Sequence, residues 1–167
     1  MKFAIAVLLF MVIGLFVRLH WFPLAQMDIL PDHPLYPVTV LRDRLMLRLI
    51  FDPARRIEYY LILSDRGVHA SKALFEKGNI RLAKETVLKA EHYFTLLVTD
   101  YKWAVWRHTP ISAELDMEIQ RAVVRHRDIF QNMLDSVSPG DAAVFQLVID
   151  FTTRNEQELL SVRQTNP

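Results

Sequence analysis

Histidines and carboxylates are the residues of this sequence best suited to bind a metal ion, since imidazole nitrogen and carboxylate oxygen are common ligands. His69 and His92 fall on neighbouring predicted helices, and Glu91 precedes His92. A two-histidine site for a metal or a peptide is one interpretation, with His69, His92 and Glu91 as its ligands. Histidines on solvated helix surfaces explain the same pattern more simply. We therefore assign no metal and no cofactor.

The motifs of known catalytic sites do not occur in the sequence. No glutamate stands three residues before any of the six histidines, which excludes the Glu-x-x-His pairs of di-iron bundles. There is no His-Glu-x-x-His, no Gly-x-Ser-x-Gly and no glycine-rich phosphate loop, and the chain has no cysteine. His126 lies on an apolar helix seam, where a hydrogen-bonded, partly buried histidine is the simpler interpretation than a ligand. We expect no enzymatic activity.

Charge argues against nucleic acid as a partner. The chain has 20 Lys and Arg against 19 Asp and Glu, so no strong positive field surrounds it. Arg121, Arg125 and Arg127 form a local basic cluster that Asp128 partly offsets. We interpret the cluster as a solvated helix face, with an anionic lipid or cell-wall polymer as the alternative ligand.

Aromatic and basic residues gather near the end of one predicted helix. Tryptophan and tyrosine beside cations are typical of protein interfaces and of membrane surfaces. The candidate partner surface consists of Tyr101, Trp103, Trp106 and Arg107, with His108 adjacent. The alternative is that a tryptophan only closes the end of a helical bundle.

The sequence predicts a membrane-targeting segment over residues 1–22. The stretch from Phe3 to Val17 is apolar and uncharged, and a helix over residues 3–22 would be about 30 Å long, the thickness of a hydrocarbon core. Arg18, Trp21 and Phe22 would lie at the membrane interface. Cleavage sites with small residues are poor, so we favour a single-pass anchor in the cell membrane with an extracytoplasmic body. The alternatives are secretion after signal cleavage and a buried soluble helix.

Residues 23–37 contain four prolines, at positions 23, 31, 34 and 37. Proline removes a backbone donor and disfavours helix at the preceding residue. We expect an extended, proline-rich strap between membrane and domain. A proline-rich ligand for an aromatic groove is the alternative.

Two motifs resemble an uncharacterised family of exported or membrane-anchored helical proteins of bacteria and archaea. One is the Leu-Pro-x-x-Pro-Leu-Tyr-Pro box from Leu30 to Pro37, and the other is Phe51-Asp52-Pro53, with Arg42-Asp43 between them. The sequence differs from the family pattern at Thr39, where lysine is usual, and around His69. The resemblance implies export and an all-helical fold, and it implies no activity.

Start and stop signals divide residues 38–165 into helices. Asp52-Pro53 is an N-cap followed by a first-turn proline, Gly78-Asn79 is a stop followed by a cap, and the fourth helix starts near Thr109 or Ser112. Residues 138–141, Ser-Pro-Gly-Asp, are close to a capping box for the fifth helix. The predicted fold is all-α, an N-terminal membrane helix followed by an antiparallel bundle of four to five helices.

One helix has a sustained apolar seam, with steps of three and four residues. Its members are Ile80, Ala83, Val87, Ala90, Phe94, Leu97, Tyr101 and Ala104. Gly67 interrupts the preceding helix, which predicts a close helix contact there.

These features favour a membrane-anchored interaction or scaffold protein of the cell envelope, with a protein partner or a second copy bound to the bundle. One alternative is a subunit of a larger envelope assembly packed through its N-terminal helices. The other is a bundle that binds a metal through histidine and carboxylate.

Overall fold

The computed structural model describes residues 29–165, in which five helices and no strands occur. The helices are α2 (Tyr36–Leu49), α3 (Pro53–Glu76), α4 (Ile80–Trp106), α5 (Ala113–Ser136) and α6 (Ala142–Thr165). The prediction of an all-helical body is confirmed. The predicted anchor over residues 3–22, with Arg18, Trp21 and Phe22, lies outside the described residues. None of the helices described is long and apolar enough to span a bilayer.

Side-chain caps fix the starts of three helices. Asp52 Oδ1 accepts a hydrogen bond from the Arg55 amide at 2.8 Å, and Asn79 and Ser112 cap α4 and α5 in the same way. Gly78 adopts a left-handed φ of 80°, which ends α3. The predicted boundaries at residues 52, 78–79 and 112 are therefore confirmed.

The predicted start of the fifth helix was too early. Residues 139–141 form a turn, and α6 begins at Ala142. The Ser138 hydroxyl bonds the Asp141 carboxylate at 3.1 Å rather than a free helix amide. The Ser-Pro-Gly-Asp pattern thus closes a turn before the helix.

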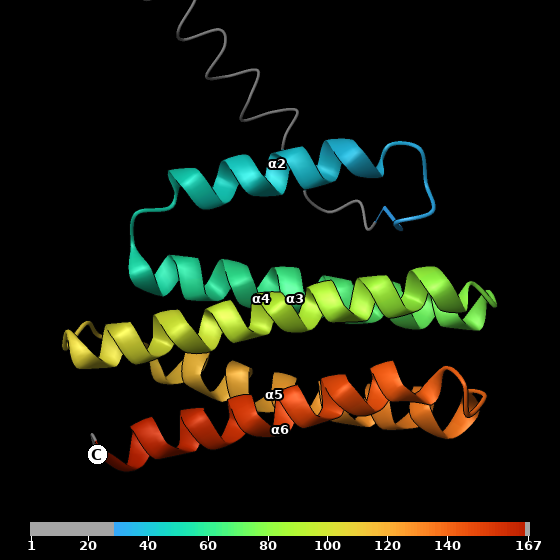
Figure 1. Cartoon of the computed structure of the whole chain (residues 1–167). Coiled ribbons are helices and arrows are strands. Elements are labelled where there is room, and N and C mark those ends of the chain that lie inside the picture. The colour runs from blue at the N-terminus through green and yellow to red at the C-terminus, as the bar shows by residue number, and fades with distance from the viewer. Residues whose placement is uncertain (1–28, 166–167) are drawn as a thin grey trace, which may run out of the picture.

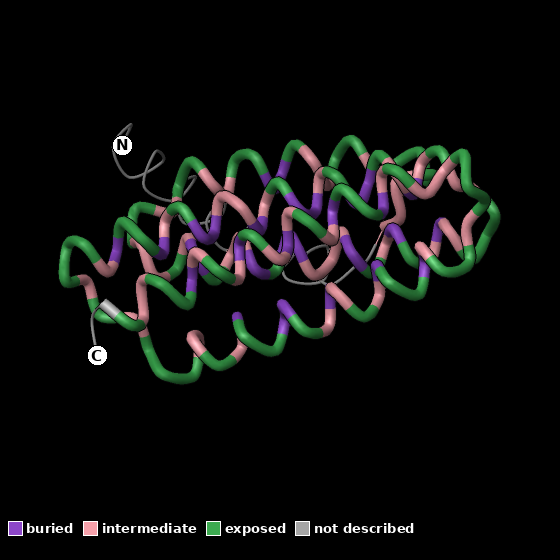
Figure 2. The backbone as a smooth tube through the Cα atoms, turned by 60° about the horizontal axis from the view of Figure 1, so that its bottom comes forward, coloured by how far each residue is buried: buried purple, intermediate pink, exposed green. Residues whose placement is uncertain are grey.

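Helices α3 to α6 form a four-helix bundle of two antiparallel pairs (Figure 1). Helix α3 packs on α4 and α5 on α6, while α4 also contacts α6 and α3 contacts α5. Going round the bundle, the order is therefore α3, α4, α6, α5. Figure 2 shows the buried residues on the inner sides of the helices.

Two apolar clusters fill the bundle, one in each half of its length. The first cluster contains Ile57, Leu61, Phe94, Leu97, Val98, Tyr101, Ala104, Ile119, Ala122, Val123 and Leu159. The second contains Val68, Leu74, Ala83, Val87, Ala90, Phe130, Met133, Phe145 and Val148. The predicted seam of α4 is confirmed from Ala83 to Ala104, while Ile80 at its start is only partly buried.

Helix α2 lies outside this bundle, along the side that α3 and α4 form (Figure 1). Residues 31–35 form turns instead of the extended strap predicted for them, and the helix begins at Tyr36. Pro37 is accommodated because proline is tolerated in the first helical turn. The buried residues of α2 are polar, Arg42 and Asp43, and its leucines at positions 41, 45 and 49 are exposed. This orientation is the reverse of an ordinary amphipathic helix.

Candidate functional site

A layer of polar side chains separates the two apolar clusters. Each helix of the bundle contributes to it at the height where its apolar residues pass from one cluster to the other. The layer consists of Ser64 and Asp65 on α3, Glu91 on α4, His126 on α5, and Thr152 and Asn155 on α6. Five of these six residues are buried, and Asp65 is partly buried. Buried polar groups are costly unless they are hydrogen-bonded, so their partners decide what the layer can do.

Glu91 is the most deeply enclosed carboxyl group of the layer, at 2% exposure. Asn155 Nδ2 donates to its Oε1 at 2.8 Å, and its Oε2 lies 3.0 Å from the Thr152 hydroxyl. Asn155 Nδ2 also donates to the Thr95 hydroxyl at 3.0 Å. The network joins α4 to α6 across the centre of the bundle.

The hydrogen bonds of this network accommodate a protonated Glu91. The Thr152 hydroxyl has one proton, and it lies within hydrogen-bond distance of both Glu91 Oε2 and the Val148 carbonyl, at 3.0 and 2.8 Å. The Val148 carbonyl already accepts the Thr152 amide within α6, so the hydroxyl proton can lie toward either oxygen. When it lies toward the carbonyl, a protonated Glu91 donates from Oε2 to the hydroxyl.

The pKa of Glu91 agrees with a protonated carboxyl group. Burial raises the pKa of the carboxyl group from its ordinary value of 4.5 to about 7, against the opposing effect of the hydrogen bonds from Asn155 and Thr152. The layer therefore exchanges a proton near neutral pH.

Asp65 and His126 form a second pair in the same layer. His126 Nε2 lies 2.6 Å from Asp65 Oδ1, and Arg125 Nη2 donates to Asp65 Oδ2 at 2.7 Å. Burial raises the pKa of Asp65, but the hydrogen bonds and charges of His126 and Arg125 outweigh it and hold that pKa below its ordinary value. His126 itself is 1% exposed, with the rings of Phe94 and Phe130 against it. The prediction of a hydrogen-bonded histidine on the seam is confirmed, but the ring is fully buried where partial burial was predicted.

Two buried atoms of the layer have no hydrogen-bond partner, Ser64 Oγ and His126 Nδ1. Within residues 29–165, no group of three or more histidine and carboxylate side chains is placed to hold a metal ion. The described part of the layer offers titratable groups that bond each helix to a neighbouring one, Glu91 to α6 and Asp65 to His126 on α5.

A family model described as a domain of unknown function (DUF5667) matches residues 28–167. The chain belongs to the DUF5667 family. The predicted membership of an uncharacterised family is thus confirmed, while the match does not test the Leu30–Pro37 box as its signature. Neither a curated protein nor a solved structure matches the chain.

The DUF5667 domain separates the three predicted metal-ligand candidates. Glu91 points toward α6 and bonds Thr152 and Asn155, whereas His69 and His92 are exposed. The ring of His92 contacts Tyr93 on its own helix, with centroids 6.2 Å apart. Glu91 is therefore part of the polar layer and not of a site with the two histidines.

The predicted aromatic surface divides into a buried and an exposed part. Tyr101 is 5% exposed and donates its hydroxyl to Asp116 at 2.7 Å, so it belongs to the interior. Trp103 and Trp106 are exposed and meet edge to face at 5.2 Å, and Arg107 lies over Trp103. The tryptophan pair is the part that remains open to a partner.

The arginines of the predicted basic cluster all have carboxylate partners. Arg121 pairs with Glu118, Arg125 with Asp65, and Arg127 with Glu156. A cluster paired in this way presents little net positive charge, which agrees with a solvated face.

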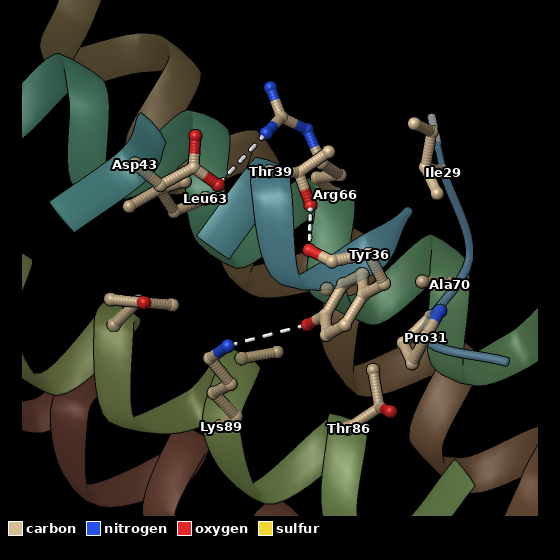
Figure 3. A pocket seen from close by; sticks show the side chains of 13 residues that line it. Ile29, Pro31, Tyr36, Thr39, Asp43, Leu63, Arg66, Ala70, Thr86 and Lys89 are labelled. Atoms are coloured by element: carbon tan, nitrogen blue, oxygen red, sulfur yellow. Dashed lines mark hydrogen bonds and ion pairs between the residues drawn. The ribbon is translucent and has the colours of Figure 1, made fainter. Parts of the chain in front are cut away.

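Polar contacts hold α2 of the DUF5667 domain against α3 and α4 (Figure 3). Asp43 accepts hydrogen bonds from the Tyr59 hydroxyl at 3.0 Å and from Arg66 at 3.3 Å. Lys89 Nζ donates to the Tyr36 hydroxyl at 3.3 Å and lies over its ring. The cavity among these residues is about 40 Å³, room for a few waters and not for a metabolite.

Asp43→Asn should loosen α2 without unfolding the bundle. The ion pair between Asp43 and Arg66 becomes a hydrogen bond from a cation to a neutral amide, which costs about 1.5 kcal/mol and raises the population of the locally open state about tenfold. Hydrogen exchange of the amides in residues 36–49 measures that opening. Exchange in α4 should stay unchanged, as should all exchange in Asp128→Asn, an exposed carboxylate on α5. Unaltered exchange in α2 would show that other contacts hold it.

Sequence reasoning missed the polar layer as a unit. The sequence patterns do not single out Asp65 or Asn155, and they place Glu91 only with His69 and His92. A signal existed, because each helix pattern places a polar residue three or four positions from buried apolar ones, as Glu91 follows Val87. Only the packing of four helices shows that these interruptions lie at one height.

Proposed function

We propose that this DUF5667 protein is a helical interaction module held at the extracytoplasmic side of the cell membrane by residues 3–22. The observation that carries the proposal is the order of the chain. The uncharged stretch from Phe3 to Val17 is long enough with its flank to reach across a bilayer, and the family domain begins at residue 28, just after it. The apolar segment thus precedes the domain and is free to serve as its tether.

The carboxyl groups inside the bundle are engaged by neighbouring side chains, which favours a binding role for the protein over a catalytic one. The carboxyl groups of Glu91 and Asp65 bond to neighbouring side chains of the polar layer. The exposed Trp103 and Trp106 offer a large apolar contact beside Arg107, the composition typical of a binding hot spot. We therefore assign the partner surface to this end of α4.

Intact mass of the protein from the membrane fraction tests the tether. The proposal expects the mass of all 167 residues and retention after carbonate extraction. A mass that lacks the first 22 to 25 residues, or release by carbonate, would overturn it.

Crosslinking in intact cells tests the partner surface. The double variant Trp103→Ala/Trp106→Ala should lose most of the crosslinked partner, because hot-spot tryptophans dominate binding energy. Leu160→Ala, an exposed apolar residue on α6, is the matched control and should retain it. Equal recovery with both variants would contradict the assignment to the tryptophan pair.

A further inference from the structure

The outer face of α2 carries a stripe of exposed apolar side chains. Val38, Leu41, Leu45 and Leu49 follow one another at steps of three and four, so they share one side of the helix. Leu41 and Leu49 are 59% and 63% exposed, and Phe51 just beyond the helix is 85% exposed. We name Val38, Leu41, Leu45, Leu49 and Phe51 the α2 stripe.

Among residues 29–165 the stripe has no apolar partner, because α2 is attached by its polar side. Asp43 and Tyr36, which bond α3 and α4, lie on the side of the helix opposite the stripe. A soluble helix would normally bury its leucines and expose its charges. The reversed orientation therefore presents an apolar face that a second apolar surface could cover.

Basic residues border the stripe on one side. Arg44 and Arg48 are exposed and four residues apart, so they form a ridge next to the ridge of Leu41 and Leu45. Leucines flanked by arginines are typical of helices that lie in a membrane interface and contact anionic headgroups.

The place of α2 in the chain also fits a membrane surface. Thirteen residues, 23–35, separate it from the end of the apolar segment, and even fully extended they span at most about 45 Å. A tethered body is therefore held within reach of the bilayer with α2 as its nearest helix. Helix α2 lies on the outside of the bundle (Figure 1), and all five side chains of the stripe are exposed.

We propose that the α2 stripe rests on the surface of an anionic lipid bilayer, with Arg44 and Arg48 on the headgroups. This inference rests on the proposed tether and adds a second contact between the protein and the membrane. A single anchor leaves the body free to rotate, whereas an anchor and an interfacial helix together hold it at one orientation. The tryptophan pair on α4 is then presented in a defined direction.

A depth-sensitive fluorophore on the full-length chain tests the inference, and the natural chain has no cysteine to interfere. Leu45→Cys labelled with a nitrobenzoxadiazole dye is reconstituted into vesicles of phosphatidylcholine, with or without phosphatidylglycerol. We expect a blue-shifted emission and several-fold weaker quenching by aqueous iodide when phosphatidylglycerol is present. Gln146→Cys, exposed on α6 away from α2, is the matched control and should be quenched fully in both.

A double variant tests the role of Arg44 and Arg48. Arg44→Gln/Arg48→Gln in the labelled chain should remove most of the gain from anionic lipid, and added salt should do the same to the unaltered protein. Equal protection in neutral and anionic vesicles would overturn the anionic preference.

Three further outcomes test the α2 contact and the tether separately. Quenching of Leu45→Cys as strong as that of the control, in a chain that resists carbonate extraction, would overturn the α2 contact and leave the tether standing. Energy transfer between labelled copies that persists on dilution in lipid would show a second copy on the stripe and would also overturn the contact. Protection by anionic vesicles in a chain that carbonate releases would support the contact and overturn the tether.

Discussion

Replacing Gly67 with leucine is expected to lower the free energy of unfolding by about 3 kcal/mol, a severe loss for a domain of this size. A Cβ atom at Gly67 would lie 2.7 Å from the Ala90 Cβ and 3.2 Å from the Ala90 Cα. The second distance involves backbone, so α3 and α4 must separate where they pack most closely. Equilibrium urea unfolding of the full chain, followed by far-ultraviolet circular dichroism, measures the loss.

Smaller substitutions at the same contact show whether the loss of stability comes from a steric clash with Ala90 or from any substitution of Gly67. Gly67→Ala gains helix propensity of about 1 kcal/mol and still creates the clash, so a net loss of about 1 to 2 kcal/mol is expected. In an Ala90→Gly background the same change should cost less, because the nearest carbon is gone. Gly140→Ala, with nothing within 4 Å of the added carbon, should be close to neutral. Full additivity of Gly67→Ala and Ala90→Gly would contradict the contact.

Glu91→Gln is expected to stabilise the protein above neutral pH and to have little effect near pH 4. The pKa of Glu91 is raised on folding, from 4.5 to about 7, so the folded state binds the proton more tightly than the unfolded state. Stability from this group is therefore complete below pH 4.5 and is lost as the pH rises through 7. The loss amounts to about 3 kcal/mol at pH 8.

The amide of glutamine reproduces the protonated carboxyl group. It accepts from Asn155 and donates to the Thr152 hydroxyl, so the network keeps its hydrogen bonds at every pH. The difference between the unfolding free energies of the two proteins, measured from pH 4 to 8, isolates Glu91 because all other groups titrate in both. Glu91→Ala is the comparison that leaves both partners unsatisfied and should destabilise at all pH values. A difference that does not vary with pH would show that folding leaves the pKa of Glu91 unchanged.

Local signals in the sequence determined the helix starts and the class of fold. Asp52, Asn79 and Ser112 cap their helices because a short polar side chain bonds a free amide two or three residues away. The period of α4 identified its buried face, and Gly67 identified a close contact. These signals act within one helical turn or within one helix face, so they can be read without the rest of the chain.

Only the tertiary structure decided which side of α2 faces the bundle and which side chains bond to Glu91. From composition alone, the leucines of α2 would be expected to face the bundle. Asp43 faces it instead, because it accepts hydrogen bonds from Tyr59 and Arg66, which lie 16 and 23 positions later in the sequence. Glu91 lies beside a buried seam, and its proton depends on Thr152 and Asn155, more than 60 positions later. Such pairings form when whole helices pack, because only then do distant side chains share one low-dielectric space. Composition and period therefore determined where each helix lies in the sequence, and packing determined which of its faces is buried and with which side chains it bonds.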